Sequence, residues 1–211
     1  MSVSRNVAVE PAEVRMVIDN VSWSSFVALA DDRRGSVPRL TYDEGVLEMI
    51  SPRRLHENLG CLIGRLVEAY SEVKGIEIIS VASVTVKRPD LLKAYEADES
   101  YYVTHAELLR DKDELDFETD PPPDLVIEVE ITSSAIQKMN LFSKMQVPEV
   151  WRHNGERLEM FRLVAGHYQP IDSSVQLPGL AVELINQTLA KRGTIGETKM
   201  IQAFRQHISI H

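Results

Sequence analysis

The chain has 211 residues, of which 44% are hydrophobic and 26% charged, and its formal net charge is −9 at pH 7. The length and composition lie in the ordinary globular range, so one compact domain with extensions is expected. The negative charge counts against binding of phosphate backbones through the overall field of the protein, although a local basic patch can persist in an acidic whole.

A single cysteine, Cys61, excludes an internal disulfide and is typical of a protein from a reducing compartment. Its place in an apolar helical pattern predicts that it is buried. Residues 1–11 contain no apolar signal core, and no run approaches the ~18 uninterrupted apolar residues that a membrane span needs. We therefore expect a soluble, cytoplasmic protein with no membrane partner.

The first half of the chain predicts two helices and a hairpin after a loose terminus at residues 1–11. Apolar residues at helical spacing predict a short helix at 22–30. Residues 39–50 form two β-rich runs around an Asp-Glu-Gly turn, which predicts a hairpin. The longest apolar periodicity predicts a helix from residue 54 to about 73, which ends at Gly75.

The second half alternates between short strands and helices. The predicted elements are strands at 76–80, 83–88 and 98–103, a helix at 104–109, a strand at 125–131, a helix at 135–146, a hairpin at 148–153 and 157–163, a strand at 168–171, and helices at 181–191 and 196–211. This order predicts an α/β sandwich, in which helices cover both faces of a mixed sheet.

The strand at 125–131 follows three consecutive prolines and carries charge within an apolar run. A side-chain period of two separates its residues into an apolar face and a partly acidic one. The partly acidic face comprises Asp124, Val126, Glu128 and Glu130. Because an unpaired buried carboxylate is costly, these carboxylates must be exposed at an edge, paired with a cation, or used to hold a metal.

A second carboxylate for the same metal as Glu128 should come from a neighbouring strand. Four extended residues separate Asp124 from Glu128 by roughly 13 Å, which is too far for ligands that each lie ~2.1 Å from one ion. Asp98, at the start of the preceding predicted strand, is the candidate. Its alternative reading is an ordinary carboxylate at a strand end.

Two lysines follow in the next predicted helix, and helical geometry separates them. Lys138 shares a row with Leu141, Phe142 and Met145, so it points with the apolar face toward the sheet. Lys144 lies in a largely polar row. The alternative for Lys138 is that its long stem carries the charge past the apolar row to water.

Asp98, Glu128 and an inward Lys138 would together suit phosphodiester hydrolysis. Two carboxylates can hold one or two Mg²⁺ ions, with Mn²⁺ as a possible substitute, and such ions polarise a phosphate and lower the pKa of a bound water. The lysine can position that water or stabilise charge that develops on phosphorus.

Several stretches of the sequence resemble the Uma-two family of restriction endonucleases, which is part of the PD-(D/E)XK nuclease superfamily. The resemblance runs from residue 23 to 178, and its motifs occur in family order. They lie at residues 40–52, 56–57, 96–98, 122–129, 131–134, 138 and 147–151. The resemblance implies a restriction-endonuclease-like three-layer sandwich with a central mixed β-sheet flanked by helices. The predicted organisation is an N-terminal extension at 1–21, a nuclease-like domain at 22–178 and a C-terminal helical extension at 179–211.

By position, the resemblance implies that Asp98 is the aspartate of the superfamily's Pro-Asp motif and Glu128 the acid of its Glu-X-Lys motif. Ala97 replaces the usual proline, which affects backbone stiffness only. Glu130 stands where the superfamily has its lysine, and the chain instead resembles members whose lysine lies in the following helix, as Lys138 does.

The resemblance further implies Glu57 as an additional metal ligand, although a glutamate on a helix face is more often only solvated. His56 also matches a family motif, and its alternative is a structural hydrogen-bonding role. Four cations are candidates for contacts with phosphates: Arg53, Arg54, Lys87 and Arg88.

The hypothesis from the sequence is a Mg²⁺-dependent endonuclease that cleaves DNA, most simply double-stranded, as a homodimer. Two alternatives stay open. The first is a catalytically silent protein that uses the nuclease scaffold for binding or assembly, which the net charge favours. The second keeps the chemistry but has RNA or a small phosphodiester as its substrate.

Overall fold

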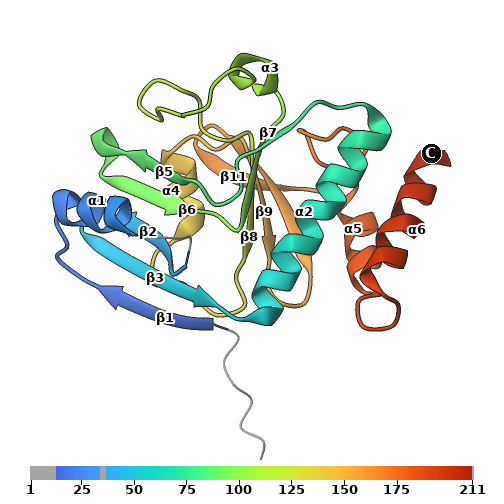
Figure 1. Cartoon of the computed structure of the whole chain (residues 1–211), viewed down its shortest axis with the longest axis horizontal. Helices are drawn as coiled ribbons and strands as arrows, with labels where there is room; N and C mark the ends of the chain where they lie inside the picture. Colours follow the sequence, from blue (N-terminus) through green and yellow to red (C-terminus); the bar gives the residue numbers. More distant parts are fainter. Residues whose placement is uncertain (1–12, 34–36, 211) are drawn as a thin grey trace, which may run out of the picture.

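The computed structural model describes residues 13–33 and 37–210. The fold is the predicted mixed α/β arrangement, with β-sheet flanked by helices (Figure 1). Its strands form two sheets, whereas the sequence analysis predicted one central sheet. One sheet has five strands and the other has six.

The five-stranded sheet is antiparallel throughout and is built from the N-terminal part of the chain. In spatial order its strands are β1 (Glu13–Ile18), β3 (Val46–Pro52), β2 (Arg39–Asp43), β6 (Lys93–Glu96) and β5 (Thr85–Arg88). The predicted hairpin at 39–50 is therefore confirmed as β2 and β3. Helix α1 (Trp23–Asp32) is the predicted helix at 22–30, and its Phe26 stacks on Tyr42. Ser22 caps this helix by accepting a hydrogen bond from Ser25 N.

The six-stranded sheet contains the strand that follows the three prolines. In spatial order its strands are β11 (His167–Ile171), β10 (Leu158–Val164), β9 (Glu149–His153), β8 (Leu125–Val129), β7 (Glu99–Tyr102) and β4 (Ile79–Ser80). Strands β8 and β9 are parallel, and the other pairs are antiparallel. The crossover between β8 and β9 contains α4 (Lys138–Lys144), as a parallel pair requires.

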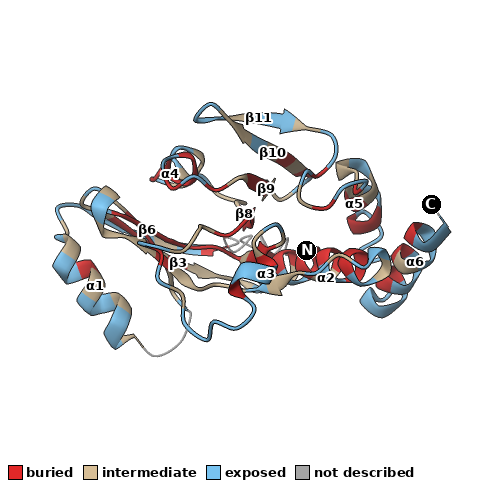
Figure 2. Cartoon of the chain, turned by 90° about the horizontal axis from the view of Figure 1, so that it is seen from above, coloured by how far each residue is buried: buried red, intermediate tan, exposed pale blue. Residues whose placement is uncertain are grey.

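Helices on both faces of this sheet give the expected three layers. Helix α2 (Arg54–Lys74) packs with Leu125, Ile127 and Val129 on one face, whereas α4 packs with Val126 on the other. Helices α5 (Val182–Leu189) and α6 (Glu197–Ile210) lie beyond α2 (Figure 1). Figure 2 shows buried residues along β8 and on the inner side of α2, and exposed residues on the outer sides of α1 and α6. The short helix α3 (Ala106–Leu109) and a 3-10 turn (Pro89–Leu91) connect strands.

The predicted strand at 98–103 is confirmed as β7, which begins one residue after Asp98. Residues 93–96 belong to β6 of the five-stranded sheet, and residues 99–102 belong to β7 of the six-stranded sheet. The chain therefore passes from one sheet to the other at this point. The sequence analysis predicted no separate strand at 93–96, so it did not show this change of sheet.

Helix α4 begins at Lys138 and not at Ala135, as the sequence predicted. Glu48 on β3 accepts hydrogen bonds from Ser134 Oγ (2.6 Å) and from Ala135 N (2.8 Å). These bonds hold the segment before the helix in a non-helical loop. The start of α4 is thus fixed by a carboxylate from the other sheet, which a local helix pattern cannot reveal.

Strand β1 was not predicted, and one residue predicted to be buried is exposed. Strand β1, which lies in the predicted N-terminal extension, pairs in register with β3 from Glu13 to Ile18. Cys61, which was predicted to be buried, is exposed. The domain boundaries stay a prediction.

Within the described ranges, no helix combines the length and the apolar character that crossing a membrane requires.

Candidate active site

The acidic face of β8 is buried against α4. All five residues of β8 are buried, and Glu128 has only 3% of its surface exposed. Alternation along the strand turns Glu128 away from the core under α2 and toward the side of the sheet that carries α4. The predicted division of this strand into two faces is therefore confirmed, and the charge on it needs partners.

Lys138 supplies the nearest partner of Glu128. Its Nζ donates to Glu128 Oε2 over 2.5 Å, so the lysine points inward as the helix-row argument predicted. Glu128 Oε1 is buried and has no hydrogen-bond partner among the described residues. Burial, together with the charge of Asp98, raises the pKa of Glu128 to about 7 against the opposing effect of Lys138. Burial lowers the pKa of Lys138, but the charges of Glu128 and Asp98 outweigh burial and raise it.

Asp98 lies where the chain changes sheets, and its side chain is almost wholly buried. Its carboxylate accepts hydrogen bonds from His56 Nε2 (2.9 Å) and from the backbone N of Val129 (2.6 Å), and it pairs with Arg39 Nη1 (2.8 Å). Burial alone would raise the pKa of Asp98, but the hydrogen bond from His56 and the charges of His56 and Arg39 lower it. Asp98 is therefore held as a carboxylate within reach of β8.

His56, in the first turn of α2, joins Asp98 to β1. Its Nδ1 lies 2.8 Å from Glu13 Oε2, and its Nε2 contacts Asp98. Burial disfavours the charged ring, but hydrogen bonds to Asp98 and Glu13 raise the pKa of His56 to about 9. Hydrogen bonds from His56, Thr132 and Arg15 outweigh burial and lower the pKa of Glu13 to about 2. At neutral pH an imidazolium thus lies between two carboxylates.

Strand β1 also covers the loop between β8 and α4. Glu13 accepts from the hydroxyl of Thr132, and Arg15 pairs with Glu13 (2.5 Å) and with the buried Glu48 (2.6 Å). Glu48 in turn holds Ser134, which lies before α4. One continuous set of charges therefore connects β1, β3 and the loop that leads to Lys138.

Glu57 is not brought directly to the two buried carboxylates. Its side chain is 47% exposed and pairs with Arg39 (2.9 Å), which also pairs with Asp98. Across residues 13–33 and 37–210, no three histidine, cysteine, aspartate or glutamate side chains form a group that could hold a metal ion. The role of Glu57 as a metal ligand stays a prediction.

Two of the predicted phosphate-binding cations are paired with nearby carboxylates. Lys87 contacts Asp31 (2.5 Å), and Arg88 contacts Asp90 (2.7 Å). Both cations lie on β5, at the edge of the five-stranded sheet away from β1. These pairs reduce the positive charge that β5 can offer to a phosphate.

The other two predicted cations lie close to the site. Arg53 immediately precedes α2 and Arg54 begins it, one turn or less from His56. Arg54 is exposed. The four cations thus fall into two separate pairs, on α2 and on β5, and do not form one patch.

Asp124 has a structural role, as its distance from Glu128 predicted. It accepts hydrogen bonds from the backbone N of Val103 (2.8 Å) and of His105 (2.9 Å), and from His105 Nδ1 (2.6 Å). It therefore fixes the chain that leaves β7.

The carboxylates of Asp98 and Glu128 suit a divalent cation that needs few ligands from the protein. Mg²⁺ keeps several waters and is commonly held by one or two carboxylates together with substrate phosphates, so a third protein ligand is not required. Glu128 Oε1, which has no partner among the described residues, is the structural observation that supports a cation site, because a buried carboxylate oxygen without a partner is costly. Asp98 and Glu128 are the residues that would hold the ion.

Sequence reasoning missed three of the charged residues that surround this pair: Glu13, Arg39 and Glu48. Each comes from the five-stranded sheet, and no local pattern links that sheet to β8. One signal was present, since Glu48 interrupts the apolar run of β3 just as Glu128 interrupts that of β8. A buried strand with a charge in it predicts a partner, but not which one.

Comparisons with known proteins agree with this architecture. The sequence profile of the Uma2 family, described as putative restriction endonuclease, matches residues 23–191. Among solved structures, a similar chain is a putative nuclease belonging to DUF820 from Anabaena variabilis ATCC 29413, with a TM-score of 0.57 and 11% sequence identity over 87% of this chain and 99% of that chain. At that identity the likeness shows a shared fold. No curated protein matches the chain.

The His56 network predicts a pH dependence of stability. Because the pKa of His56 is about 9 in the fold and 6.5 is its ordinary value, its contribution is complete below pH 6.5 and is lost as pH rises to about 9. We expect this loss to be about 3 kcal/mol, since one pKa unit corresponds to ~1.4 kcal/mol. Denaturant unfolding at several pH values, with a chelator present, should show the loss in the wild type and not in His56→Gln. Parallel curves for both proteins would contradict it.

Proposed function

The chain belongs to the Uma2 family, and we propose that it is a metal-dependent endonuclease that hydrolyses phosphodiester bonds in DNA. The observation that carries the proposal is the buried pair of carboxylates, Asp98 and Glu128, beside the half-buried Lys138; Glu128 Oε1 has no partner among the described residues. Burial of so much charge is costly unless a function or a full set of partners requires it. Perturbed carboxylates beside an inward lysine are also the expected character of a catalytic site.

The protein's own residues prepare this site in two ways. His56, Arg39 and the backbone N of Val129 fix Asp98 and keep it ionised. Lys138 holds one oxygen of Glu128, and the other is buried with no hydrogen-bond partner among the described residues. Both carboxylates are thus oriented before any ligand arrives, which is the preorganisation that catalysis requires.

A bound Mg²⁺ or Mn²⁺, held by Asp98 and Glu128, would polarise the phosphate and lower the pKa of a water. Lys138 is suited to a second task there, because its ammonium can orient the attacking water or stabilise negative charge on the phosphate oxygens. Glu57 shares Arg39 with Asp98 and is proposed as an auxiliary ligand.

The family and the charged residues near the site support a proposal for the substrate. We propose double-stranded DNA and a homodimer that cuts both strands. Arg53 and Arg54 at the start of α2 are the proposed phosphate contacts nearest the site, and Lys87 and Arg88 are more remote ones. Because the net charge is −9, this attraction must be local.

One observation favours a second candidate function, a nuclease-fold protein that binds without cutting. Lys138 already pairs with Glu128, and His56 and Arg39 already pair with Asp98, so much of the charge is balanced by the protein itself. In such a protein the ion pairs would hold the two sheets together. Binding of a divalent cation distinguishes the two functions.

The carboxylates supply the first test. We expect Asp98→Asn and Glu128→Gln to reduce Mg²⁺-dependent nicking of plasmid DNA to background, because each removes a metal ligand while it keeps the side-chain volume. Glu128→Gln leaves Lys138 without its anion, which can cost roughly 3–5 kcal/mol. The double variant Glu128→Gln/Lys138→Met removes both charges and controls for that loss. Nicking that persists in a folded carboxylate variant would remove that residue from the site.

The two lysines of α4 supply a matched pair for the second test. We expect Lys138→Ala to lower the rate of nicking by roughly 10²–10³-fold, the range seen when one preorganised electrostatic group is removed. Lys144→Ala, on the exposed side of the same helix, should leave the rate nearly unchanged. Single-turnover rates at saturating Mg²⁺ measure this difference. The opposite ranking would show that Lys138 is only a structural partner of Glu128.

A further inference from the structure

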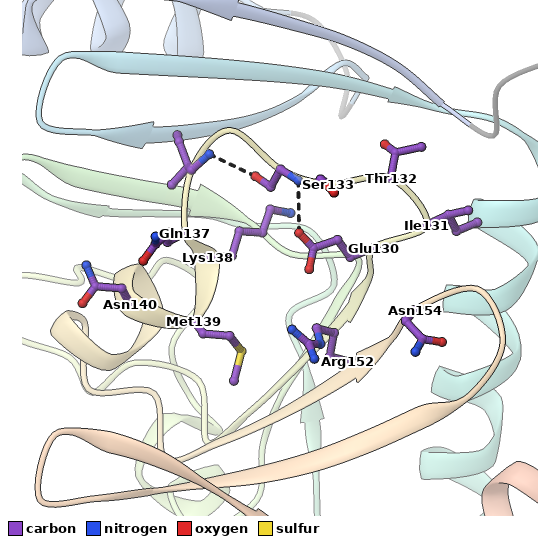
Figure 3. A pocket seen from close by; sticks show the side chains of 12 residues that line it. Glu130, Ile131, Thr132, Ser133, Gln137, Lys138, Met139, Asn140, Arg152 and Asn154 are labelled. Atoms are coloured by element: carbon purple, nitrogen blue, oxygen red, sulfur yellow. Dashed lines mark hydrogen bonds between the residues drawn. The ribbon is translucent and has the colours of Figure 1, made fainter.

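A pocket of ≈ 610 Å³ opens beside Lys138, between the loop that follows β8 and the turn between β9 and β10. Figure 3 shows the loop above the pocket, Arg152 and Asn154 on the opposite side, and Lys138 and Glu130 between them. Lys138 is the only member of the proposed catalytic trio among the residues that line it. The pocket therefore reaches the proposed centre at the lysine.

The lining combines charge, hydrogen-bonding groups and apolar surface. Lys138 and Arg152 supply two cations, and Glu130 supplies a carboxylate. Amide and hydroxyl side chains such as Asn154 and Ser133 lie around them, and Met139 adds apolar surface. A small site with a few convergent polar groups is the usual form of a ligand pocket.

Arg152 can bind a ligand in addition to its present partner, Glu159. Its Nη2 donates to Glu159 (3.0 Å) across β9 and β10, and its guanidinium lies 5.5 Å from the ring centre of Phe161. Its Nε is buried and has no hydrogen-bond partner among the described residues. The Arg152 side chain as a whole is 34% exposed and lines the pocket, so its guanidinium can contact a phosphate or the acceptor edge of a base there.

We propose that this pocket binds one unpaired nucleotide of the nucleic acid strand, next to the phosphate that the site cleaves. The identity of the ligand rests on the proposed nuclease function. Arg152 would contact phosphate or base acceptors. Glu130 accepts a hydrogen bond of 3.3 Å from Ser134 N and no other from the described residues, and it would accept from an exocyclic amine of the base. Met139 would contact the face of the base.

The size of the pocket explains why the nucleotide must be unpaired. Small-molecule sites measure roughly 300–1,000 Å³, and this pocket lies within that range. A duplex is instead bound by an open surface that buries roughly 1,000–2,500 Å² of protein. A base that leaves the stack can enter a pocket of this size, at an unpairing cost of about a few kcal/mol that is lowest at a mismatch or in a single strand.

Calorimetric titration with nucleoside 5′-monophosphates, in the presence of a chelator, tests the proposal without cleavage. We expect the wild type to bind them at millimolar affinity or tighter. Ser133→Trp should fill the pocket and weaken binding at least about tenfold, or about 1.4 kcal/mol, whereas Ser133→Ala should bind as the wild type does. Arg152→Ala should also weaken binding about tenfold, and Arg162→Ala, outside the pocket, should not. Titration with deoxyribo- and ribonucleotides in parallel shows which sugar is preferred.

Absence of binding to the wild type, or equal binding by Ser133→Trp and Ser133→Ala, would overturn the proposal. A cleavage assay on the same proteins distinguishes failure of the proposed pocket from failure of the proposed nuclease function. Metal-dependent nicking without nucleotide binding would refute the pocket alone, and nucleotide binding without nicking would refute the nuclease function alone. If both hold, a duplex with an unpaired bulge should be cut faster than the matched duplex, and Ser133→Trp should lose that preference.

Discussion

The structure depends on the burial of Glu128 in the middle of the six-stranded sheet. A buried carboxylate is tolerated only if cations, hydrogen bonds or a metal compensate for the water that it loses. Lys138 compensates one of its oxygens, and the other has no partner among the described residues. This requirement accounts for one feature of the fold, the crossover after β8 that returns a lysine to the sheet. The change of sheets at Asp98 instead brings a second negative charge near Glu128, which raises the pKa of Glu128 and increases the need for a cation.

The charges around this point alternate in sign from β1 to α4. Glu13, His56 and Asp98 form one such sequence, and Arg15 connects Glu13 to Glu48, which holds the loop before α4. Because each buried charge has an opposite neighbour, the set can stay ionised out of water. The arrangement ties the five-stranded sheet to the six-stranded sheet. It also explains why β1, which sequence reading placed in an extension, is part of the environment of the site.

The sequence predicted those features of the structure that depend on local patterns of residues, and it missed those that depend on contacts between distant segments. The alternation along 125–131, the apolar row that contains Lys138 and the Asp-Glu-Gly turn are local patterns, and the structure confirms them. The division of the strands into two sheets, the late start of α4 and the partners Glu13, Arg39 and Glu48 arise from contacts between distant segments. A charged residue in an apolar strand predicts that a partner exists, but only the tertiary structure identifies it. The roles of Glu57 and of the four cations stay predictions for the same reason.

The central claim is that Asp98 and Glu128 are held together in order to bind a divalent cation. Calorimetric titration of the wild type and of Glu128→Gln with Mg²⁺ and Mn²⁺ tests it most directly, because it needs neither a substrate nor a partner. The account predicts that the wild type binds either ion, with an affinity that increases as pH rises through about 7 and Glu128 ionises, and that the variant does not. Failure of the wild type to bind either ion at millimolar concentration, or equal binding by both proteins, would contradict it. The buried pairs with Lys138, His56 and Arg39 would then serve only to hold the two sheets together.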